Sequence, residues 1–153
     1  MQLTQFTDYS LRALIFIAVK QDTCTIPEIA QAYGISQHHL TKIIHNLSKL
    51  GIIKTTRGRG GGMSLAVDPQ SLNLKTLVLQ LEPHFDIVPC FNVKKQNCCI
   101  APSCKLKHVL HEAQQAFFKV LEQVTLADVL KNSQGLQRLL GIESSSLSLK
   151  KLD

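Results

Sequence analysis

Apolar side chains recur every three or four positions through the first fifty residues, which is the spacing of helices with one buried face. A first helix is expected over about residues 8–20, with Thr7 as its cap. Pro27 suits the first position of a second helix, which runs to Tyr33 and ends at Gly34. The apolar face of the first helix consists of Leu11, Leu14, Ile15 and Ala18.

A third helix is expected directly after the glycine turn. Ser36 is a suitable cap, and the helix should continue to about Leu50. Its inward face is expected to hold Leu40, Ile43, Ile44, Leu47 and Leu50. A short helix, a glycine turn and a longer helix together form the helix-turn-helix pattern, whose second helix reads DNA in the major groove.

Two β-prone runs follow, residues 52–56 and 63–67, and the Gly-rich basic residues 57–62 separate them. This arrangement predicts a β-hairpin, the wing of a winged helix-turn-helix. The glycines could also suggest a phosphate-binding loop, but the Lys-Ser/Thr ending of that motif is missing and no helix follows directly. We therefore expect a mainly α fold with a small β-hairpin wing, and a DNA-binding domain over residues 1–82.

The second half of the chain is expected to hold a short helix over residues 74–81, a loop over residues 83–104, and a dimerisation helix in the region 104–135. Apolar residues at steps of three or four predict this last helix, of about twenty residues and about 30 Å. They are Leu106, Val109, Leu110, Ala113, Phe117, Val120, Leu121 and Val124. A small domain cannot cover so long a stripe, so pairing with a second copy is expected; the alternative is a core helix within one chain. Residues 144–153, rich in Ser and Lys, are expected to be disordered.

Positive charge is concentrated in the predicted DNA-binding domain. The net charge is +6, and no Asp or Glu occurs from Ile29 through Val67. A basic field confined to one module is typical of a polyanion-binding face, whereas the alternative is a merely solvated basic surface. The residues expected to contact DNA, from the start of the third helix and from the hairpin tip, are Ser36, Gln37, His38, His39, Lys42, Arg57 and Arg59.

Four of the five cysteines lie between positions 90 and 104: Cys90, Cys98, Cys99 and Cys104. Thiols gathered in one loop are candidates for metal ligands, disulfide partners or redox groups. Structural zinc commonly uses Cys-x(2–4)-Cys pairs, and none occurs here unless the adjacent Cys98 and Cys99 are counted. An iron–sulfur cluster accepts irregular spacing, and another group can replace a missing fourth thiolate. Spacing alone leaves a cluster, zinc and a thiol switch open.

Two further features concern single cysteines. Ser103 is a plausible cap for the long helix, and it would place Cys104 at the positive end of that helix, where a thiolate is favoured. Cys24 lies far from the other four in sequence, so we expect a buried or merely unpaired thiol there.

Short segments spread over most of the chain carry a resemblance to a known family. Those of the first half are Met1-Gln2-Leu3-Thr4, Phe6-Thr7-Asp8-Tyr9, Leu11-Arg12-Ala13-Leu14, His39-Leu40, Lys42-Ile43-Ile44, Leu47-Ser48, Arg57-Gly58 and Gly61-Gly62. Those of the second half are Leu81-Glu82-Pro83, Cys98-x-Ile100-x-Pro102-x-Cys104-Lys105-Leu106-Lys107 and Thr125-Leu126-Ala127-Asp128. Through these segments, residues 1 to about 135 resemble the Rrf2 family of winged-helix regulators that carry iron–sulfur clusters, and most closely its nitric-oxide-sensing branch.

The resemblance implies a ligand set that spacing could not supply. Three cysteines of the loop, Cys90, Cys98 and Cys104, would bind the cluster, which is expected to be of the 4Fe–4S rather than the 2Fe–2S type. Asp8 from the partner subunit would be the fourth ligand, and Arg12 would hold its carboxylate; the alternative role for Asp8 is an ordinary helical ion pair with Arg12. Cys99 is an alternative ligand beside Cys98. The related cluster-biogenesis branch uses a His three residues after the last Cys, and here Lys107 stands at that place.

These features together predict a homodimeric, DNA-binding transcriptional repressor that is not an enzyme. Its operator would be a pseudo-palindromic double-stranded DNA, and nitric oxide would release it by attacking the cluster. The alternatives are an iron- or redox-sensing regulator of the same family, a zinc-containing DNA-binding protein, and an iron–sulfur redox enzyme or electron carrier. The N-terminus shows no signal peptide, and the longest apolar stretch, Leu11–Val19, is shorter than the about 20 residues that cross a membrane. A cytoplasmic protein without membrane contact is therefore expected.

Overall fold

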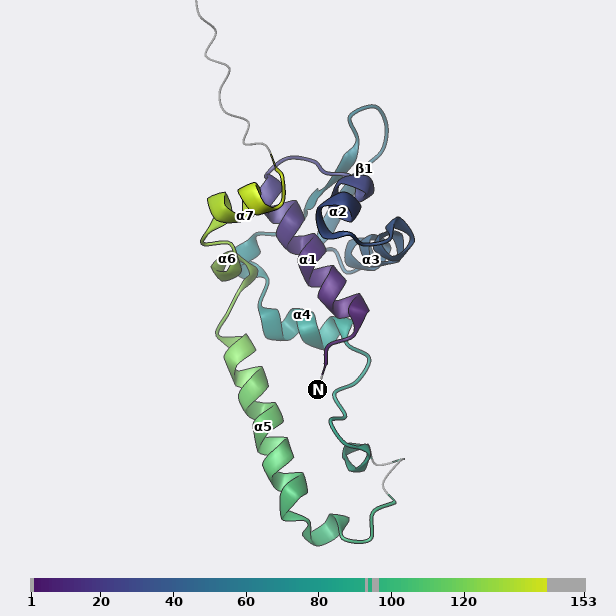
Figure 1. Ribbon diagram of the computed structural model, residues 1–153, viewed down its shortest axis with the longest axis vertical. Coiled ribbons are helices and arrows are strands. Elements are labelled where there is room, and N and C mark those ends of the chain that lie inside the picture. Colours follow the sequence, from purple (N-terminus) through teal and green to yellow (C-terminus); the bar gives the residue numbers. More distant parts are fainter. Residues whose placement is uncertain (1, 93, 95–96, 143–153) are drawn as a thin grey trace, which may run out of the picture.

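The computed structural model describes residues 2–92, 94 and 97–142 and shows a mainly helical molecule with one two-stranded sheet (Figure 1). The helices are α1 (Gln5–Lys20), α2 (Ile26–Tyr33), α3 (Gln37–Lys49), α4 (Leu74–Leu81), α5 (Lys105–Glu122), α6 (Leu126–Val129) and α7 (Ser133–Leu139). The strands are β1 (Ile53–Thr56) and β2 (Gly62–Leu65), and short 3-10 turns are η1 (Pro69–Ser71), η2 (Pro89–Phe91) and η4 (Ala101–Ser103). In the described part of the chain, no helix combines the length and apolar character needed to cross a membrane.

The first helix begins earlier than its apolar spacing predicts. Thr4 is the cap of α1, and its Oγ1 accepts a hydrogen bond of 3.3 Å from the backbone N–H of Thr7. Thr7 itself is fully buried inside the first turn, so the prediction of Thr7 as cap is wrong. Both threonines are acceptable caps by residue type, and the choice between them depends on tertiary contacts of Thr4.

The helix-turn-helix is confirmed, with α2 and α3 joined by a glycine turn. At the start of α2 the backbone N–H of Thr25 donates to the Glu28 carboxylate over 2.7 Å, which is one half of a capping box. Gly34 ends α2 with a φ of 64°, a left-handed conformation that glycine adopts without strain. Leu50, expected on the inward face of α3, is instead the residue after the helix and is 40% exposed.

The hairpin is antiparallel, with Ile53 opposite Leu65 and Thr56 opposite Gly62. The turn between α1 and α2 adds a further pairing, because the backbones of Cys24 and Met63 exchange hydrogen bonds of 3.0 and 2.8 Å. A Cβ at Gly62 would lie 2.8 Å from the Cys24 carbonyl oxygen, so only glycine permits this approach. The wing is thereby attached to the rest of the domain, a contact that the sequence did not predict.

The core of the predicted DNA-binding domain is aliphatic and lies where α1 packs on α3 and the hairpin. Its fully buried large side chains include Leu14, Ile29, Leu40, Ile43, Leu47 and Leu77. Leu40, Ile43 and Leu47 share one face of α3, as their spacing predicts. Burial of this face leaves the opposite face of α3 at the surface.

In Figure 1, α5 extends away from α1–α4 along the long axis of the molecule, while α6 and α7 return to the side of α1. The side-chain amide of Gln137 in α7 donates to the Val19 carbonyl at the end of α1 over 3.2 Å. Half of the apolar stripe predicted for α5 is exposed within the single chain, and Leu106, Val109 and Val120 are 65%, 59% and 63% exposed. A core helix within one chain, the alternative reading, would bury these residues, so their exposure favours the expected pairing with a second copy. The predicted tail, residues 144–153, lies outside the described residues.

Candidate DNA-binding face and cysteine segment

The start of α3 presents a polar surface to solvent. Gln37, His38, His39 and Lys42 are all exposed, and the buried Leu40 and Ile43 hold the other side of the helix against the core. Ser36 occupies the cap position, but its side chain makes no capping hydrogen bond and is also exposed. All five residues predicted to read DNA from this helix are therefore free of contacts that would prevent it.

The hairpin tip brings two arginines to the surface beside glycines with unusual backbone angles. Arg57 and Arg59 are exposed, and Gly58 and Gly60 have φ values of 106° and 82°. A side chain at Gly61 would meet the Thr56 carbonyl oxygen at 2.4 Å. The tight tip requires these glycines, and it leaves the two guanidinium groups free to reach a phosphate backbone or a minor groove.

The first turns of α1 lie beside the side chains that are predicted to read DNA. The rings of Tyr9 and His39 are 6.5 Å apart, and these two residues with Gln5, Phe6, Lys42 and Ile43 line a small cavity of about 170 Å³. A shift of the N-terminal end of α1 would therefore change the surroundings of His39 and Lys42.

Asp8 and Arg12 form the ion pair that their spacing predicts. The Arg12 guanidinium lies 2.9 Å from the Asp8 carboxylate, and both side chains are partly exposed. The hydrogen bond to Asp8 raises the pKa of Arg12 above its usual value, and the guanidinium also lies 6.0 Å from the centre of the Tyr33 ring. An exposed helical pair of this kind contributes about 0.3–0.5 kcal/mol to stability, so it orients the carboxylate more than it stabilises the fold.

The four clustered cysteines lie on the segment that joins α4 to α5, residues 82–104, here called the cysteine segment. Cys90 is in η2, Cys104 is the residue that precedes α5, and both are half-buried, while Cys98 and Cys99 are exposed. Ser103 lies in η4 and does not cap α5, so that prediction is wrong; the cap position belongs to Cys104 itself. Cys104 thus stands at the N-terminal, positive end of an 18-residue helix.

All five cysteines are free thiols. Within the described residues, no three His, Cys, Asp or Glu side chains gather as a metal-binding group. The three predicted cysteine ligands therefore share one segment without being brought together, and Asp8 lies apart from them in α1. The donor set itself fits an iron–sulfur cluster, because Cys90, Cys98 and Cys104 are neither disulfide-bonded nor fully buried. Cys24 differs from these three in its burial: it is completely buried, and desolvation raises the pKa of its thiol to about 12, which keeps it protonated and unreactive.

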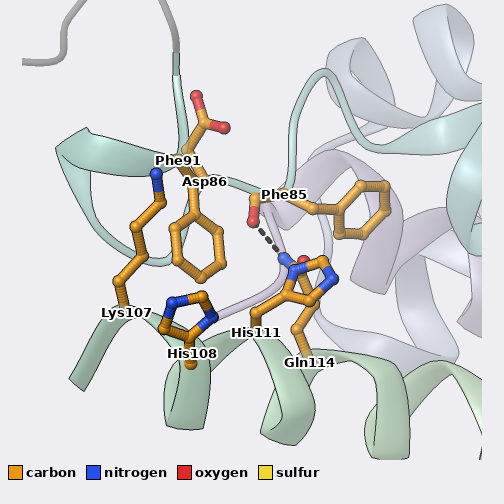
Figure 2. A pocket seen from close by; sticks show the side chains of 7 residues that line it. All are labelled: Phe85, Asp86, Phe91, Lys107, His108, His111 and Gln114. Carbon is orange, nitrogen blue, oxygen red and sulfur yellow. Dashed lines mark hydrogen bonds between the residues drawn. The ribbon is translucent and has the colours of Figure 1, made fainter. Parts of the chain in front are cut away.

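The cysteine segment is packed against α5 by aromatic residues that sequence analysis overlooked. The Phe85 and Phe118 rings meet edge to face at 4.9 Å, and Phe91 meets His111 at 6.1 Å. Figure 2 shows the side-chain amide of Gln114 donating to the Phe85 carbonyl, at one side of a cavity of about 410 Å³ between the segment and α5. The sequence did contain a signal for this packing, because Phe85 and Phe91 both lie in the predicted loop of a chain with only 5% aromatic residues.

Comparison with known proteins identifies the family. The profile of the Rrf2 family, described as an iron-dependent transcriptional regulator, matches residues 3–132. The chain belongs to the Rrf2 family.

Two curated relatives extend this match over nearly the whole chain. The HTH-type transcriptional regulator NsrR of Bacillus subtilis is 46% identical over 142 residues, which cover 92% of this chain and 97% of the relative. The protein of the same name from Oceanobacillus iheyensis is 47% identical over 145 residues, covering 94% and 99%.

Solved structures of this Rrf2 protein's neighbours confirm the winged-helix fold. T. potens IscR superimposes with a TM-score of 0.69 at 25% identity, covering 90% of this chain and 91% of the other. CymR of B. subtilis, a global cysteine regulator, gives a TM-score of 0.66 at 24% identity, covering 86% and 98%. The chain is therefore a transcriptional regulator of the Rrf2 family, with a mainly α fold and a small hairpin wing as predicted.

Proposed function

We propose that this regulator is a homodimeric repressor that acts in the cytoplasm, and that its operator binding depends on an iron–sulfur cluster and is relieved by nitric oxide. The observation that carries the proposal is the position of three free cysteines on the segment between the DNA-binding domain and α5. Its similarity over more than nine-tenths of the chain to relatives named NsrR supports the nitric-oxide signal. Both relatives are named as transcriptional regulators, which supports a regulatory and not a catalytic role.

Cys90, Cys98 and Cys104 would hold the cluster, of the 4Fe–4S type, with Asp8 of the partner subunit as fourth ligand. When bound, the cluster would supply iron atoms that nitric oxide can attack. The 2.9 Å ion pair between Arg12 and Asp8 supports this assignment, because Arg12 would hold the Asp8 carboxylate in place. A ligand set shared between the cysteine segment of one subunit and α1 of the other restrains the distance between the two DNA-binding domains. Loss of that restraint can weaken operator binding by no more than the free energy with which the restraint favoured the DNA-competent arrangement of the dimer.

The exposed apolar side chains of α5 support the dimer. Leu106, Val109 and Val120 stand at spacings of three and eleven residues, so they share one face of the helix. A second copy of α5 would remove this face from water, at about 25 cal/mol per Å² of apolar surface. Two recognition helices would then face a pseudo-palindromic operator.

Purification without oxygen tests the proposal most directly. The protein should contain iron and sulfide, absorb visible light, and bind its operator; nitric oxide should abolish the binding. Exposure of parallel samples to oxygen and to an iron chelator separates this signal from redox or iron sensing in the same family. Zinc in place of iron and sulfide, or operator binding that none of the three treatments changes, would contradict the proposal.

Substitution at the DNA-reading face should show which residues read bases and which bind phosphate. Arg57→Ala on the wing is expected to weaken binding to all DNA sequences alike and to reduce the slope of log affinity against log salt by about 1. Gln37→Ala should instead cost about 1–3 kcal/mol of discrimination at one base position, because its amide can bond an adenine in two places. Fluorescence anisotropy across a salt series, with cognate and scrambled operators, measures both. The exposed Gln115 on α5 provides a control, since Gln115→Ala should change neither quantity.

A further inference from the structure

Glu82, the residue before Pro83, contacts Thr4 near the beginning of the chain. The backbone N–H of Thr4 donates to the Glu82 carboxylate over 2.6 Å, and the Thr4 hydroxyl donates to the same oxygen over 3.2 Å. Thr4 is the cap of α1, so Glu82 places a negative charge at the positive end of a 16-residue helix. Glu82 is also where α4 ends and the cysteine segment begins.

This contact replaces a local one. In α2 and α6 the cap is a threonine whose backbone N–H is bonded by an acidic residue three positions later, Glu28 or Asp128. In α1 the corresponding residue is the buried Thr7, which has no carboxylate. Glu82 therefore completes the cap of α1 from a distant part of the chain, and the start of α1 is positioned by a tertiary contact.

The opposite end of α4 is attached to α5. The side-chain amide of Asn73 donates to the Glu122 carbonyl over 2.7 Å, while its oxygen accepts the backbone N–H groups of Lys75 and Thr76. Lys75 and Glu122 add an ion pair of 2.9 Å. The short helix α4 is thus held to α5 at its beginning and to α1 at its end.

Three parts of the molecule meet around Glu82. A cavity of about 140 Å³ there is lined by Leu3 and Thr4 from the N-terminus, by Glu82 and Phe85 from the cysteine segment, and by Phe117 from α5. Phe85 is also the residue whose carbonyl accepts from Gln114 of α5. A displacement of the cysteine segment relative to α5 therefore acts first on Glu82 and its partner.

We propose that Glu82 is the positioning residue through which the cysteine segment sets the orientation of α1 and so of the DNA-reading side chains. The inference rests on the proposed control of DNA binding by the cysteine segment. Its path is short, since Thr4 begins the helix whose Tyr9 lies against His39. When the cluster holds the cysteine segment in place, the Glu82–Thr4 contact fixes the start of α1. When the cluster is lost, the position of α1 relative to α3 is no longer fixed by this contact.

Glu82→Ala and Glu82→Gln test the inference. Glu122→Ala is the matched control, because it removes an exposed glutamate at the end of α5 that pairs with Lys75 in the first turn of α4. Hydrogen exchange over residues 2–10 of the cluster-free protein measures the contact itself. Glu82→Ala should raise exchange there by about tenfold or more, the effect of losing hydrogen bonds to a charged group. Glu82→Gln should raise it less, because the amide oxygen still accepts the Thr4 N–H, and Glu122→Ala should leave it unchanged.

Operator affinity, measured with and without the cluster, then tests the coupling. Glu82→Ala should keep the iron and sulfide of the wild-type protein but reduce the ratio between the two affinities. An unchanged exchange rate, an unchanged ratio, or loss of iron at unchanged exchange would each overturn the inference. If Glu82→Ala fails to fold, the smaller change in Glu82→Gln decides by the same criteria. A wild-type protein without iron would refute the proposed function alone; the inference would then stand only if Glu82→Ala raises exchange and weakens operator binding.

Discussion

Replacement of Cys104 by alanine is expected to remove the iron and sulfide and to weaken operator binding by about 100-fold or more. Loss of a residue that only hydrogen-bonds a metal ligand already lowers metal affinity by about 10–100-fold, so loss of a ligand should cost at least as much. Operator binding should fall with the cluster on which it is proposed to depend. The fold should survive, because Cys104 is only half-buried and its side chain makes no capping hydrogen bond. Iron and sulfide per chain, the visible spectrum and the operator dissociation constant, all measured without oxygen, check this result. A variant with full iron content and undiminished binding would contradict the assignment.

Cys99 supplies the matched control for this experiment. It is an exposed free thiol in the same segment, directly beside Cys98. If Cys98 is the ligand, Cys98→Ala should behave as Cys104→Ala does, and Cys99→Ala should resemble the wild type. The reverse result would assign the second thiolate to Cys99 while leaving the cluster itself in place.

A charge on the exposed face of α5 is expected to separate the two subunits. Val109 is 59% exposed in the single chain, and Val109→Asp would place an unpaired carboxylate in the proposed interface, where burial of a charge is costly. Operator affinity should fall by roughly 10²–10⁴-fold, because the second recognition helix no longer binds as part of the same molecule. Sedimentation and operator binding, measured at equal concentrations, check both effects.

Gln115→Asp is the control for this second prediction. Gln115 is also exposed on α5, but its position six residues after Val109 turns it toward a different face of the helix. The Gln115→Asp protein should remain a dimer and bind the operator with wild-type affinity. A dimeric Val109→Asp protein with unchanged binding would show that the exposed stripe of α5 is not the interface.

Local signals in the sequence predicted most of the elements. The bounds of α4 agree with the predicted residues 74–81, because Asn73 caps its start and Pro83 follows its end. The glycine turn between α2 and α3, the buried face of α3 and the hairpin were also correctly predicted. These features depend on residue spacing and on single caps, which act over a few positions of the chain.

Two of the errors concern helix caps. The caps of α1 and α5 were assigned to Thr7 and Ser103, which are both acceptable by residue type. In the structure the cap of α1 is Thr4 and the cap of α5 is Cys104. In α1 a contact from a distant residue made the choice, because the Glu82 carboxylate bonds to Thr4. The packing of Phe85 and Gln114 was overlooked for the same reason, since neither residue belongs to a periodic pattern.

From the sequence alone come the helical spacing, the region free of acidic residues, the four clustered thiols and the membership of the Rrf2 family. Each is a property of residue order and composition. Only the tertiary structure decides that Thr4 meets Glu82, that Cys24 pairs with Met63, and that the apolar face of α5 stays uncovered. The physical reason is that hydrogen bonds and burial between residues far apart in sequence, 78 positions for Thr4 and Glu82, depend on how complete elements pack and leave no periodic trace in the chain.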